Sequence, residues 1–385
     1  MKRHVIVIPT PWRHRFGQLS IHQVVLEDVR KLADHYDITI LQQKGWGFPE
    51  GPWRIVESAD EFRADLPVGG VTPDMAAVFV KTMDNKDLVL CYDPITPLQL
   101  GGMLYNHHIS RLYAFPKFVL RFVSNVLDFS REPFLRRIFQ TTITSLPVIW
   151  NSGQAWASGH RFLVGQKVFR PDTRLWYTAP LSIDTKRIDQ LRGEMWPKPD
   201  VVTVRAPWNR IAEVKQPELF LEVVTTVAAL RPIRAQVPIS SEGLTDPQRI
   251  TLDKWRKAGI EVLLDHHAPA DRDGYYRSLG GAHAFLSTSK SESFGLTQLE
   301  YLYAGMIGVY LDADYLEMLP GYPFVANRAD LAPLLMAVLS DIDAAQERVE
   351  PFRAYIREKY SYEASKATLL QAVENLFKLY VDRQE

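Results

Sequence analysis

Two glutamates, eight residues apart, are the side chains of this sequence best placed to do chemistry. Glu292 lies in a run of small polar residues, and Glu300 lies about two turns into a helix that Gly305 would end. The apolar run 284–286 before them predicts a short buried strand. Free N–H groups at the start of the helix suit an anion such as a diphosphate. The carboxylates suit hydroxyl groups, so we expect a ligand with central phosphates and a polyol at each end, as in a nucleotide sugar.

The elements that must position these glutamates form two α/β halves. A β-branched run over 5–8, a helical pattern over 19–36 and a second strand over 37–41 make a βαβ opening, which implies a parallel sheet. The second half alternates helices with strands, which we expect at 200–204, 235–239, 260–264, 284–286 and 306–311.

These patterns define four parts of the chain. We expect a Rossmann-like domain over 1–180, a linker over 181–199, a second Rossmann-like domain over 200–350, which carries both glutamates, and helices over 351–385. Because ligands of such two-domain proteins bind between the domains, we expect the active cleft there.

The composition is that of an ordinary globular protein. The formal net charge is zero, 46% of the residues are hydrophobic, and Cys91 is the only cysteine. A single cysteine excludes an intrachain disulfide and a cysteine-based zinc site, and it suits a reducing cytosol. No apolar run approaches the roughly 20 residues of a membrane span, and the N-terminal apolar run is too short for a signal peptide. We therefore expect a cytoplasmic protein.

The segment 111–177 has a different composition, with ten basic residues against three acidic ones and aromatic residues throughout. The basic residues are Arg111, Lys117, Arg121, Arg131, Arg136, Arg137, Arg161, Lys167, Arg170 and Arg174. Cations neutralise phosphates and aromatic rings stack on bases, which favours a nucleic-acid surface. The same pattern suits a face for anionic lipid. It also suits a helical region with aromatic side chains in the core and solvated charges.

The site residues resemble a known family. The spacing from Glu292 to Glu300, with Phe294-Gly295-Leu296 between, resembles the E-x7-E element of retaining glycosyltransferases of the GT-B fold, particularly glycosyltransferase family four. Arg210 and Lys215, five residues apart, look like the family's diphosphate clamp, and two fixed cations do match a pyrophosphate. The resemblance covers about residues 200–370 well and matches the first half only in the order of its elements. It implies that the domain over 200–350 binds the nucleotide sugar and that the domain over 1–180 binds the acceptor. The sequence Tyr360-Ser361-Tyr362-Glu363 looks like the start of the family's last helix, which implies that the helices over 351–385 pack back on the first domain.

The resemblance implies a role for each residue of the element. Glu292 would hydrogen-bond the hydroxyls of the donor sugar. The amides near Ser293, Phe294 and Gly295 would cradle phosphate or sugar. Glu300 would hold the ribose of the nucleotide.

The first half departs from the family in two places. The family usually has paired glycines in its first loop, where this chain has Gly17 alone. The family commonly has a histidine after the fifth strand, where this chain offers Asp128. Asp128 and Asp93 are therefore, beside Glu292, the catalytic candidates, with either aspartate as the group that activates the acceptor. Asp93 ends the strand expected at 88–92, where it equally suits a helix cap.

The resemblance implies a transferase with a nucleoside-diphosphate sugar, such as a UDP-sugar, as donor and no tightly bound cofactor. The sequence 312–314 looks like a metal-binding D-x-D of another fold, but cations already serve the phosphates, so we expect no metal requirement. The acceptor favoured by segment 111–177 is a hydroxylated base in duplex DNA, as for a bacteriophage-type DNA glycosyltransferase. The alternatives are a glycan or lipid-linked acceptor in surface polysaccharide synthesis, a nucleotide-sugar epimerase, or a binding protein without transfer activity.

Overall fold

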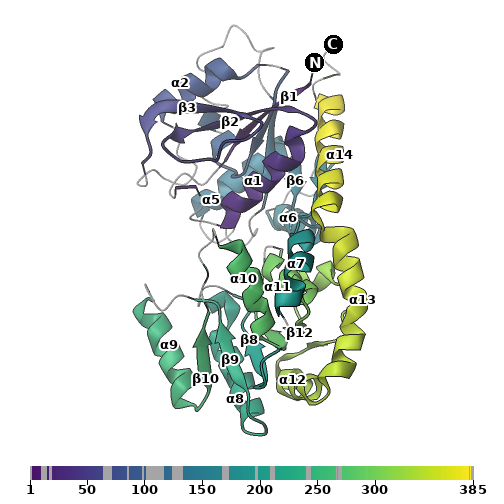
Figure 1. The fold of residues 1–385 in the computed structure, drawn as a ribbon. Helices are drawn as coiled ribbons and strands as arrows, with labels where there is room; N and C mark the ends of the chain where they lie inside the picture. The colour runs from purple at the N-terminus through teal and green to yellow at the C-terminus, as the bar shows by residue number, and fades with distance from the viewer. Residues whose placement is uncertain are drawn as a thin grey trace. The chain divides into compact units, whose positions relative to one another are not determined.

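The computed structural model divides the chain into two compact α/β units (Figure 1). Unit 1 comprises Met1–Leu181 and Ser365–Glu385, and unit 2 comprises Ser182–Ala364. The structure describes residues 2–9, 15–16, 20–63, 72–84, 86–97, 99–100, 117–123, 133–166, 173–195, 198–208, 213–239, 244–265, 267, 271–290, 292, 294–380 and 382.

Unit 1 is built on a parallel sheet of seven strands in the order β3-β2-β1-β4-β5-β6-β7. Its strands are β1 (His4–Ile8), β2 (Asp37–Lys44), β3 (Arg54–Glu61), β4 (Leu88–Cys91), β5 (Lys117–Phe122), β6 (Val148–Trp150) and β7 (Trp176–Thr178). Its helices are α1 (Ser20–Ala33), α2 (Pro73–Thr82), α5 (Pro133–Ser145), α6 (Gly153–Gly165) and, from Ser365 on, α14 (Tyr362–Tyr380).

The βαβ opening is confirmed. β1 pairs in parallel with β2 and with β4, through Val5 opposite Ile38 and opposite Leu88. Every residue of Val5–Ile8 is fully buried, as expected of a central parallel strand with helices on both faces.

Segment 111–177 contains strands that the sequence analysis did not predict. β5, β6 and β7 lie there, and Phe122, Phe139, Trp150 and Trp176 pack together in one buried cluster. The rings of Phe122 and Trp150 lie 5.1 Å apart, edge to face. For these four residues the aromatic pattern therefore reflects a hydrophobic core, as in the third alternative above, but that alternative's helical region was wrong, because Phe122, Trp150 and Trp176 lie on strands.

Arg121 on β5 is a buried cation that belongs to the core of unit 1. Its side chain is fully buried, and its Nε donates to Asp28 Oδ2 on α1 at 2.8 Å. Its Nη1 donates to the carbonyl of Ala179, beyond β7, at 2.9 Å. Burial disfavours the charged carboxylate of Asp28, but the Arg121 guanidinium, Lys31 and the Tyr92 hydroxyl together outweigh burial and hold the pKa of Asp28 below its usual value. Arg121 therefore fastens α1 to the far edge of the sheet.

Unit 2 is built on a parallel sheet of six strands in the order β10-β9-β8-β11-β12-β13. Its strands are β8 (Thr203–Arg205), β9 (Arg234–Val237), β10 (Glu261–Leu264), β11 (Ala284–Ser287), β12 (Ile307–Leu311) and β13 (Val325–Ala326). Its longer helices are α7 (Thr185–Leu191), α8 (Pro217–Ala228), α9 (Asp246–Lys257), α10 (Arg272–Ser278), α11 (Leu296–Ala304), α12 (Leu331–Ser340) and α13 (Ile342–Tyr360). Its 3-10 helices are η2 (Arg192–Met195), η3 (Glu213–Lys215), η4 (Leu279–Gly281), η5 (Asp314–Met318) and η6 (Arg328–Asp330).

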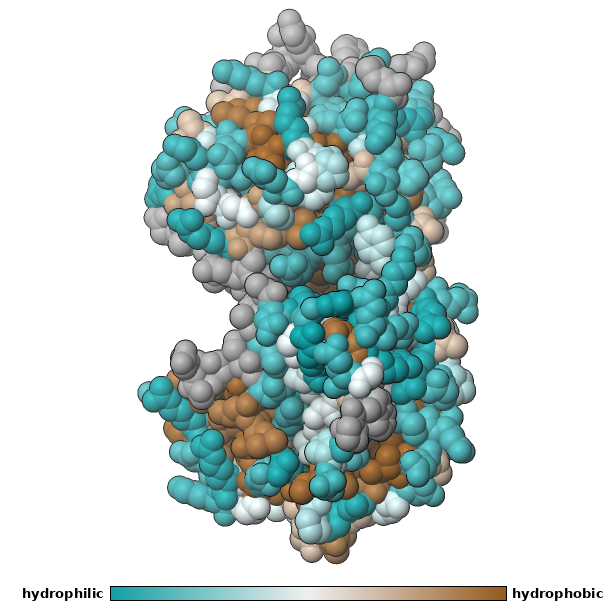
Figure 2. All heavy atoms as spheres, in the orientation of Figure 1, coloured by the Kyte–Doolittle hydropathy of each residue, from teal (hydrophilic) through white to brown (hydrophobic). Residues whose placement is uncertain are grey.

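The surface of unit 2 is apolar over its edge strand. Figure 2 shows hydrophobic atoms over β10, where Leu263 is 37% exposed, and Ile250 on the neighbouring α9 is 57% exposed. Edge strands carry unpaired backbone groups, so an apolar edge is a place where strands of other chains can add.

The chain passes between the units twice, at 181/182 and at 364/365. The segment that the sequence analysis expected as a linker, 181–199, contains α7 and η2, which belong to unit 2. Ile188 on α7 is fully buried. The C-terminal helix returns to the first unit within α14, after a break at Ser361.

Lys198 gives unit 2 a distinctive pH dependence. Burial, with Arg353 and Arg205 nearby, lowers the pKa of its ammonium from 10.5 to about 8. Between these two values the unfolded chain keeps a proton that the folded chain has lost. The free energy of unfolding should therefore rise with pH by up to about 1.4 kcal/mol per unit in this window, relative to a Lys198→Met variant. Chemical denaturation at pH 7, 8, 9 and 10 measures it; a difference that stays constant would contradict the prediction.

Candidate functional site

Two loops of unit 2 meet at the carboxyl ends of β8 and β11. Thr288 Oγ1, just after β11, donates to the carbonyl of Lys215 at 2.7 Å, and Gln216 Nε2 donates back to the carbonyl of Thr288 at 2.6 Å. The backbone N–H of Lys290 donates to the carbonyl of Val214 at 3.0 Å. The loop after β11 is thus fixed to the segment that follows β8, at the edge of the sheet where ligands of parallel α/β proteins bind.

An ion pair joins the two loops. Lys215 Nζ lies 2.5 Å from Glu292 Oε1, with side-chain exposures of 15% and 13%. Gln298 Nε2 lies 3.4 Å from the same oxygen. The structure therefore brings together a cation that the resemblance assigns to phosphate and a carboxylate that it assigns to hydroxyl groups.

Buried polar groups lie behind Glu292. Gln298 Nε2 contacts Ser287 Oγ at 3.1 Å, and this hydroxyl is hydrogen-bonded to Tyr315 OH at 2.8 Å. Burial and the charge of Glu292 raise the pKa of Tyr315, so its phenol keeps its proton. These contacts orient the Gln298 amide and, through it, Glu292.

Helix α11 begins later than expected. Gly295 precedes it with φ 77°, a left-handed conformation, and Leu296 is the first helical residue. Glu300 is therefore the fifth residue of the helix, just over one turn from its start, and the predicted two turns were wrong. The N–H groups of Gln298 and Leu299 donate to the carbonyl of Gly295, which leaves those of Leu296 and Thr297 without an acceptor inside the helix. These two N–H groups can receive an anion beside Lys215.

Gly295→Ala tests the conformation that starts α11. A Cβ at this position would meet Met318 Cε at 2.7 Å, and the left-handed backbone disfavours any side chain. We expect the free energy of unfolding to fall by about 1–2 kcal/mol. Gly165→Ala is the control, because a Cβ on Gly165, at the end of α6, meets nothing within 4 Å. Equal stabilities of the two variants in denaturant titrations would contradict the assignment.

Glu300 lies in a polar cradle formed with α10. Its carboxylate is buried and accepts hydrogen bonds from Arg272 Nη2 at 2.6 Å, from Tyr275 OH at 2.7 Å and from Tyr276 OH at 3.3 Å. Phe294, between the two glutamates of the E-x7-E element, is 4% exposed, and its ring packs edge to face on the ring of Tyr360 in the same unit. Its side chain therefore anchors the loop that carries Glu292.

Asp93 makes the contacts of a capping residue. Its Oδ1 accepts from the backbone N–H groups of Ile95 at 2.7 Å and Thr96 at 2.8 Å, and its Oδ2 accepts from Thr96 Oγ1 at 2.7 Å. A catalytic role for Asp93 stays a prediction. Four further candidates, Asp128, Arg210, Ser293 and Gly17, lie outside the described residues.

Sequence reasoning missed Gln216, Gln298, Arg272 and Tyr275. Gln216 is next to Lys215, and Gln298 is six residues after Glu292, so their positions in the sequence could have suggested them. No local pattern marks Arg272 and Tyr275, since they reach Glu300 from another helix.

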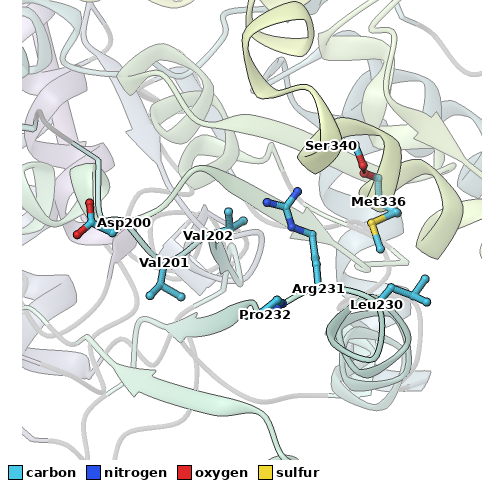
Figure 3. Close-up of a pocket in the computed structure, with 8 residues that line it drawn as sticks. All are labelled: Asp200, Val201, Val202, Leu230, Arg231, Pro232, Met336 and Ser340. Atoms are coloured by element: carbon cyan, nitrogen blue, oxygen red, sulfur yellow. Dashed lines mark hydrogen bonds between the residues drawn. The ribbon is translucent and has the colours of Figure 1, made fainter.

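The pocket drawn in Figure 3 lies at the amino ends of strands of the same sheet, whereas the site at Lys215 lies at the carboxyl ends. Its volume is about 630 Å³. It is lined by residues 200–202, before β8, by 230–232, before β9, and by Met336 and Ser340 of α12. It therefore takes no part in the site at Lys215.

In the described ranges, no three histidine, cysteine, aspartate or glutamate side chains gather to hold a metal ion. No helix in the same ranges has the length and hydropathy to cross a membrane.

The two parallel α/β units, with a C-terminal helix that returns to the first, form the GT-B fold of glycosyltransferases. No family model matches the sequence. Sucrose-phosphate synthase from Thermosynechococcus elongatus aligns with a TM-score of 0.75 and 14% identity, over 98% of this chain and 100% of that one. Anabaena HepE in complex with UDP-glucose aligns with a TM-score of 0.67 and 13% identity, over 97% of this chain and 100% of that one. A UDP-forming trehalose-phosphate synthase from Burkholderia xenovorans aligns with a TM-score of 0.66 and 12% identity, over 97% of this chain and 99% of that one.

Proposed function

We propose that this chain is a cytoplasmic glycosyltransferase that moves a sugar from a nucleoside-diphosphate sugar to an acceptor hydroxyl, with retention at the anomeric carbon. The observation that carries the proposal is the pairing of Lys215 with Glu292 beside the first turn of α11. The structural neighbours solved with UDP or UDP-glucose support it, because they use the same fold.

The residues of the site have complementary tasks in this reaction. An arriving diphosphate attracts the Lys215 ammonium and the N–H groups of α11, which frees the Glu292 carboxylate to accept hydroxyl groups of the sugar. As the bond between the anomeric carbon and the diphosphate oxygen breaks, negative charge grows on the leaving diphosphate. Lys215, together with Arg210, stabilises that charge. The acceptor oxygen bonds to the anomeric carbon and gives up one proton, and either Asp93 or Asp128 is the predicted base that takes it.

The identity of the molecule that receives the sugar is the most specific part of the proposal. The proposal of a hydroxylated base in duplex DNA as acceptor loses the support of Phe122 and Trp150, which are in the core and cannot stack on bases. In the described part of the segment it keeps exposed cations and Phe134, which is 65% exposed. In the described part of segment 111–177, Arg137, Arg161 and Arg174 are exposed. Binding of duplex DNA that weakens steeply with added salt would support this acceptor, and flotation with anionic vesicles would favour a lipid-linked one.

One experiment separates transfer from the other activities that this fold hosts. The full chain is incubated with UDP-, GDP- and ADP-sugars, with and without hydroxymethylated duplex DNA or a glycan panel, and the released nucleotide is followed. A transferase releases nucleotide faster when its acceptor is present. Conversion of the donor sugar without an acceptor would indicate an epimerase, and binding without any conversion would contradict the proposed function.

A further inference from the structure

We propose that unit 1 contains a carbohydrate-binding site, which takes one uncharged sugar ring of a glycan against Trp53 and binds its hydroxyl groups through Asp37 and Arg54. The site lies at the amino ends of β1, β2 and β3, which are neighbours in the sheet of unit 1. The site at Lys215 lies in unit 2, at the carboxyl ends of its strands. The proposed function gives this second site no role, so the inference stands or fails independently of it.

A pocket at this end of the sheet has the size of a small-ligand site. Its volume is about 540 Å³, within the roughly 300–1,000 Å³ that such sites occupy. In the parallel register, His4 of β1 lies opposite Asp37 of β2. Thr39 of β2 lies opposite Arg54 of β3. Asp37 and Thr39 are two residues apart, so their side chains are on the same face of the sheet. The three strands therefore bring side chains of different chemistry to one pocket.

The side chain of Trp53 is half-buried, lines this pocket and is held from three directions. Its Nε1 donates to the carbonyl of Pro49 at 3.0 Å, and the ring of Phe48 packs on it edge to face at 5.9 Å. A Cβ on Gly51 would lie 2.3 Å from atoms of the ring, so the ring rests directly on the Gly51 backbone. An aromatic face carries partial negative charge, which attracts the C–H groups on the face of a sugar ring. Trp53 therefore offers a fixed apolar surface for one sugar ring.

Asp37 and Arg54 supply hydrogen-bonding groups that the protein itself does not use. Both side chains are exposed and line the pocket, and neither forms a hydrogen bond or an ion pair with any residue that the structure describes. A carboxylate accepts hydrogen bonds on two oxygens, and a guanidinium donates five. Neighbouring hydroxyl groups of a sugar both donate and accept, so Asp37 and Arg54 can each bind a pair of them.

The charge of the pocket favours an uncharged ligand. The opposite formal charges of Asp37 and Arg54 cancel. His4 has both ring nitrogens in use, with Nδ1 2.8 Å from Asp87 Oδ1 and Nε2 2.8 Å from Thr39 Oγ1. A phosphate chain gains little here, because Asp37 repels the anion that Arg54 attracts. The pocket therefore suits a neutral glycan better than a nucleic acid or an anionic lipid.

Titration calorimetry on the full chain, without any nucleotide sugar, tests the proposal with maltohexaose, cellohexaose, mannohexaose and chitohexaose, and with oligothymidylate. We expect at least one of the saccharides to bind wild type. Trp53→Leu should weaken that binding about tenfold or more, and Asp37→Asn and Arg54→Gln about three- to tenfold each, because an apolar contact or a hydrogen bond is lost. Asp74→Asn is the matched control, because Asp74 is exposed on α2 of the same unit and is not among the residues that line the pocket; its affinity should equal that of wild type.

Three results would overturn the proposal. The first is that none of these saccharides binds wild type. The second is that a saccharide binds wild type and all three pocket variants with equal affinity, which would place it elsewhere. The third is that oligothymidylate binds more tightly than every saccharide and loses affinity in Trp53→Leu, which would place a nucleic acid in the pocket. Asp37→Asn and Arg54→Gln change only exposed side chains, so they decide the test even where Trp53→Leu does not fold.

Discussion

Replacement of Lys215 by methionine should lower kcat/KM for sugar transfer by about 10²- to 10³-fold, with the protein still folded. Methionine keeps an unbranched apolar stem and removes the ammonium that lies 2.5 Å from Glu292 in this structure. The loss should be large because a fixed cation at the leaving diphosphate acts on charge that develops in the transition state. Initial rates of nucleotide release, measured over a range of donor concentrations, give kcat/KM for wild type and variant.

A surface lysine of the same unit provides the control. Lys254 on α9 is 55% exposed and pairs with Glu218, so Lys254→Met removes the same charge away from the site. Its kcat/KM should stay within about twofold of wild type. A Lys215→Met protein that melts like wild type and keeps full activity would show that Lys215 does not hold the diphosphate.

Replacement of Arg121 by methionine should lower the free energy of unfolding by about 3–5 kcal/mol. The substitution leaves the carboxylate of Asp28 buried without the cation 2.8 Å from it and leaves the carbonyl of Ala179 without its donor. Lys31 lies 3.6 Å from the other carboxylate oxygen and carries a pKa lowered by burial, so it replaces Arg121 only in part. Urea unfolding followed by circular dichroism measures the change.

A second substitution separates the uncompensated charge from lost packing. In the double variant Arg121→Met with Asp28→Asn the buried carboxylate is gone, so part of the stability should return. Arg256→Met, which breaks an exposed pair with Asp253 on α9, should change stability by less than about 1 kcal/mol. An Arg121→Met variant no less stable than Arg256→Met would contradict the structural role of Arg121.

The central strands of both sheets could be predicted because their signal is local. The run at 5–8 is apolar at every position, and a strand covered by helices on both faces needs that pattern. The runs at 88–91 and 284–287 are fully buried for the same reason. Each was expected within one residue of its observed bounds.

Strand β5, in segment 111–177, could not be predicted in this way, although the apolar run 148–150 of β6 carries the same local signal as 284–286. Arg121 in β5 has the residue type of a surface position, and its burial depends on Asp28, 93 residues earlier in the chain. A pairing over that distance leaves no trace in the local sequence pattern. Charge counted along the segment therefore suggested a surface, although one of its cations lies in the core.

The residues of the site that lie on the two loops could be predicted. Lys215 and Glu292 were assigned from the resemblance. They are 77 residues apart in the sequence, and their side chains meet because β8 and β11 are neighbours in the sheet. The cradle of Glu300 was not predictable, because it depends on how α10 packs beside α11. The start of α11 was also misplaced, because a left-handed Gly295 ends the loop later than the polar run suggests.

Titration calorimetry of UDP, GDP and ADP into the full chain and into Lys215→Met tests the central claim most directly. We predict that at least one of these diphosphates binds wild type, and that the substitution weakens its binding at least tenfold, because a charge-assisted contact to phosphate is lost. Absence of binding to all three, or equal affinities of wild type and Lys215→Met, would contradict a diphosphate site at Lys215 and Glu292.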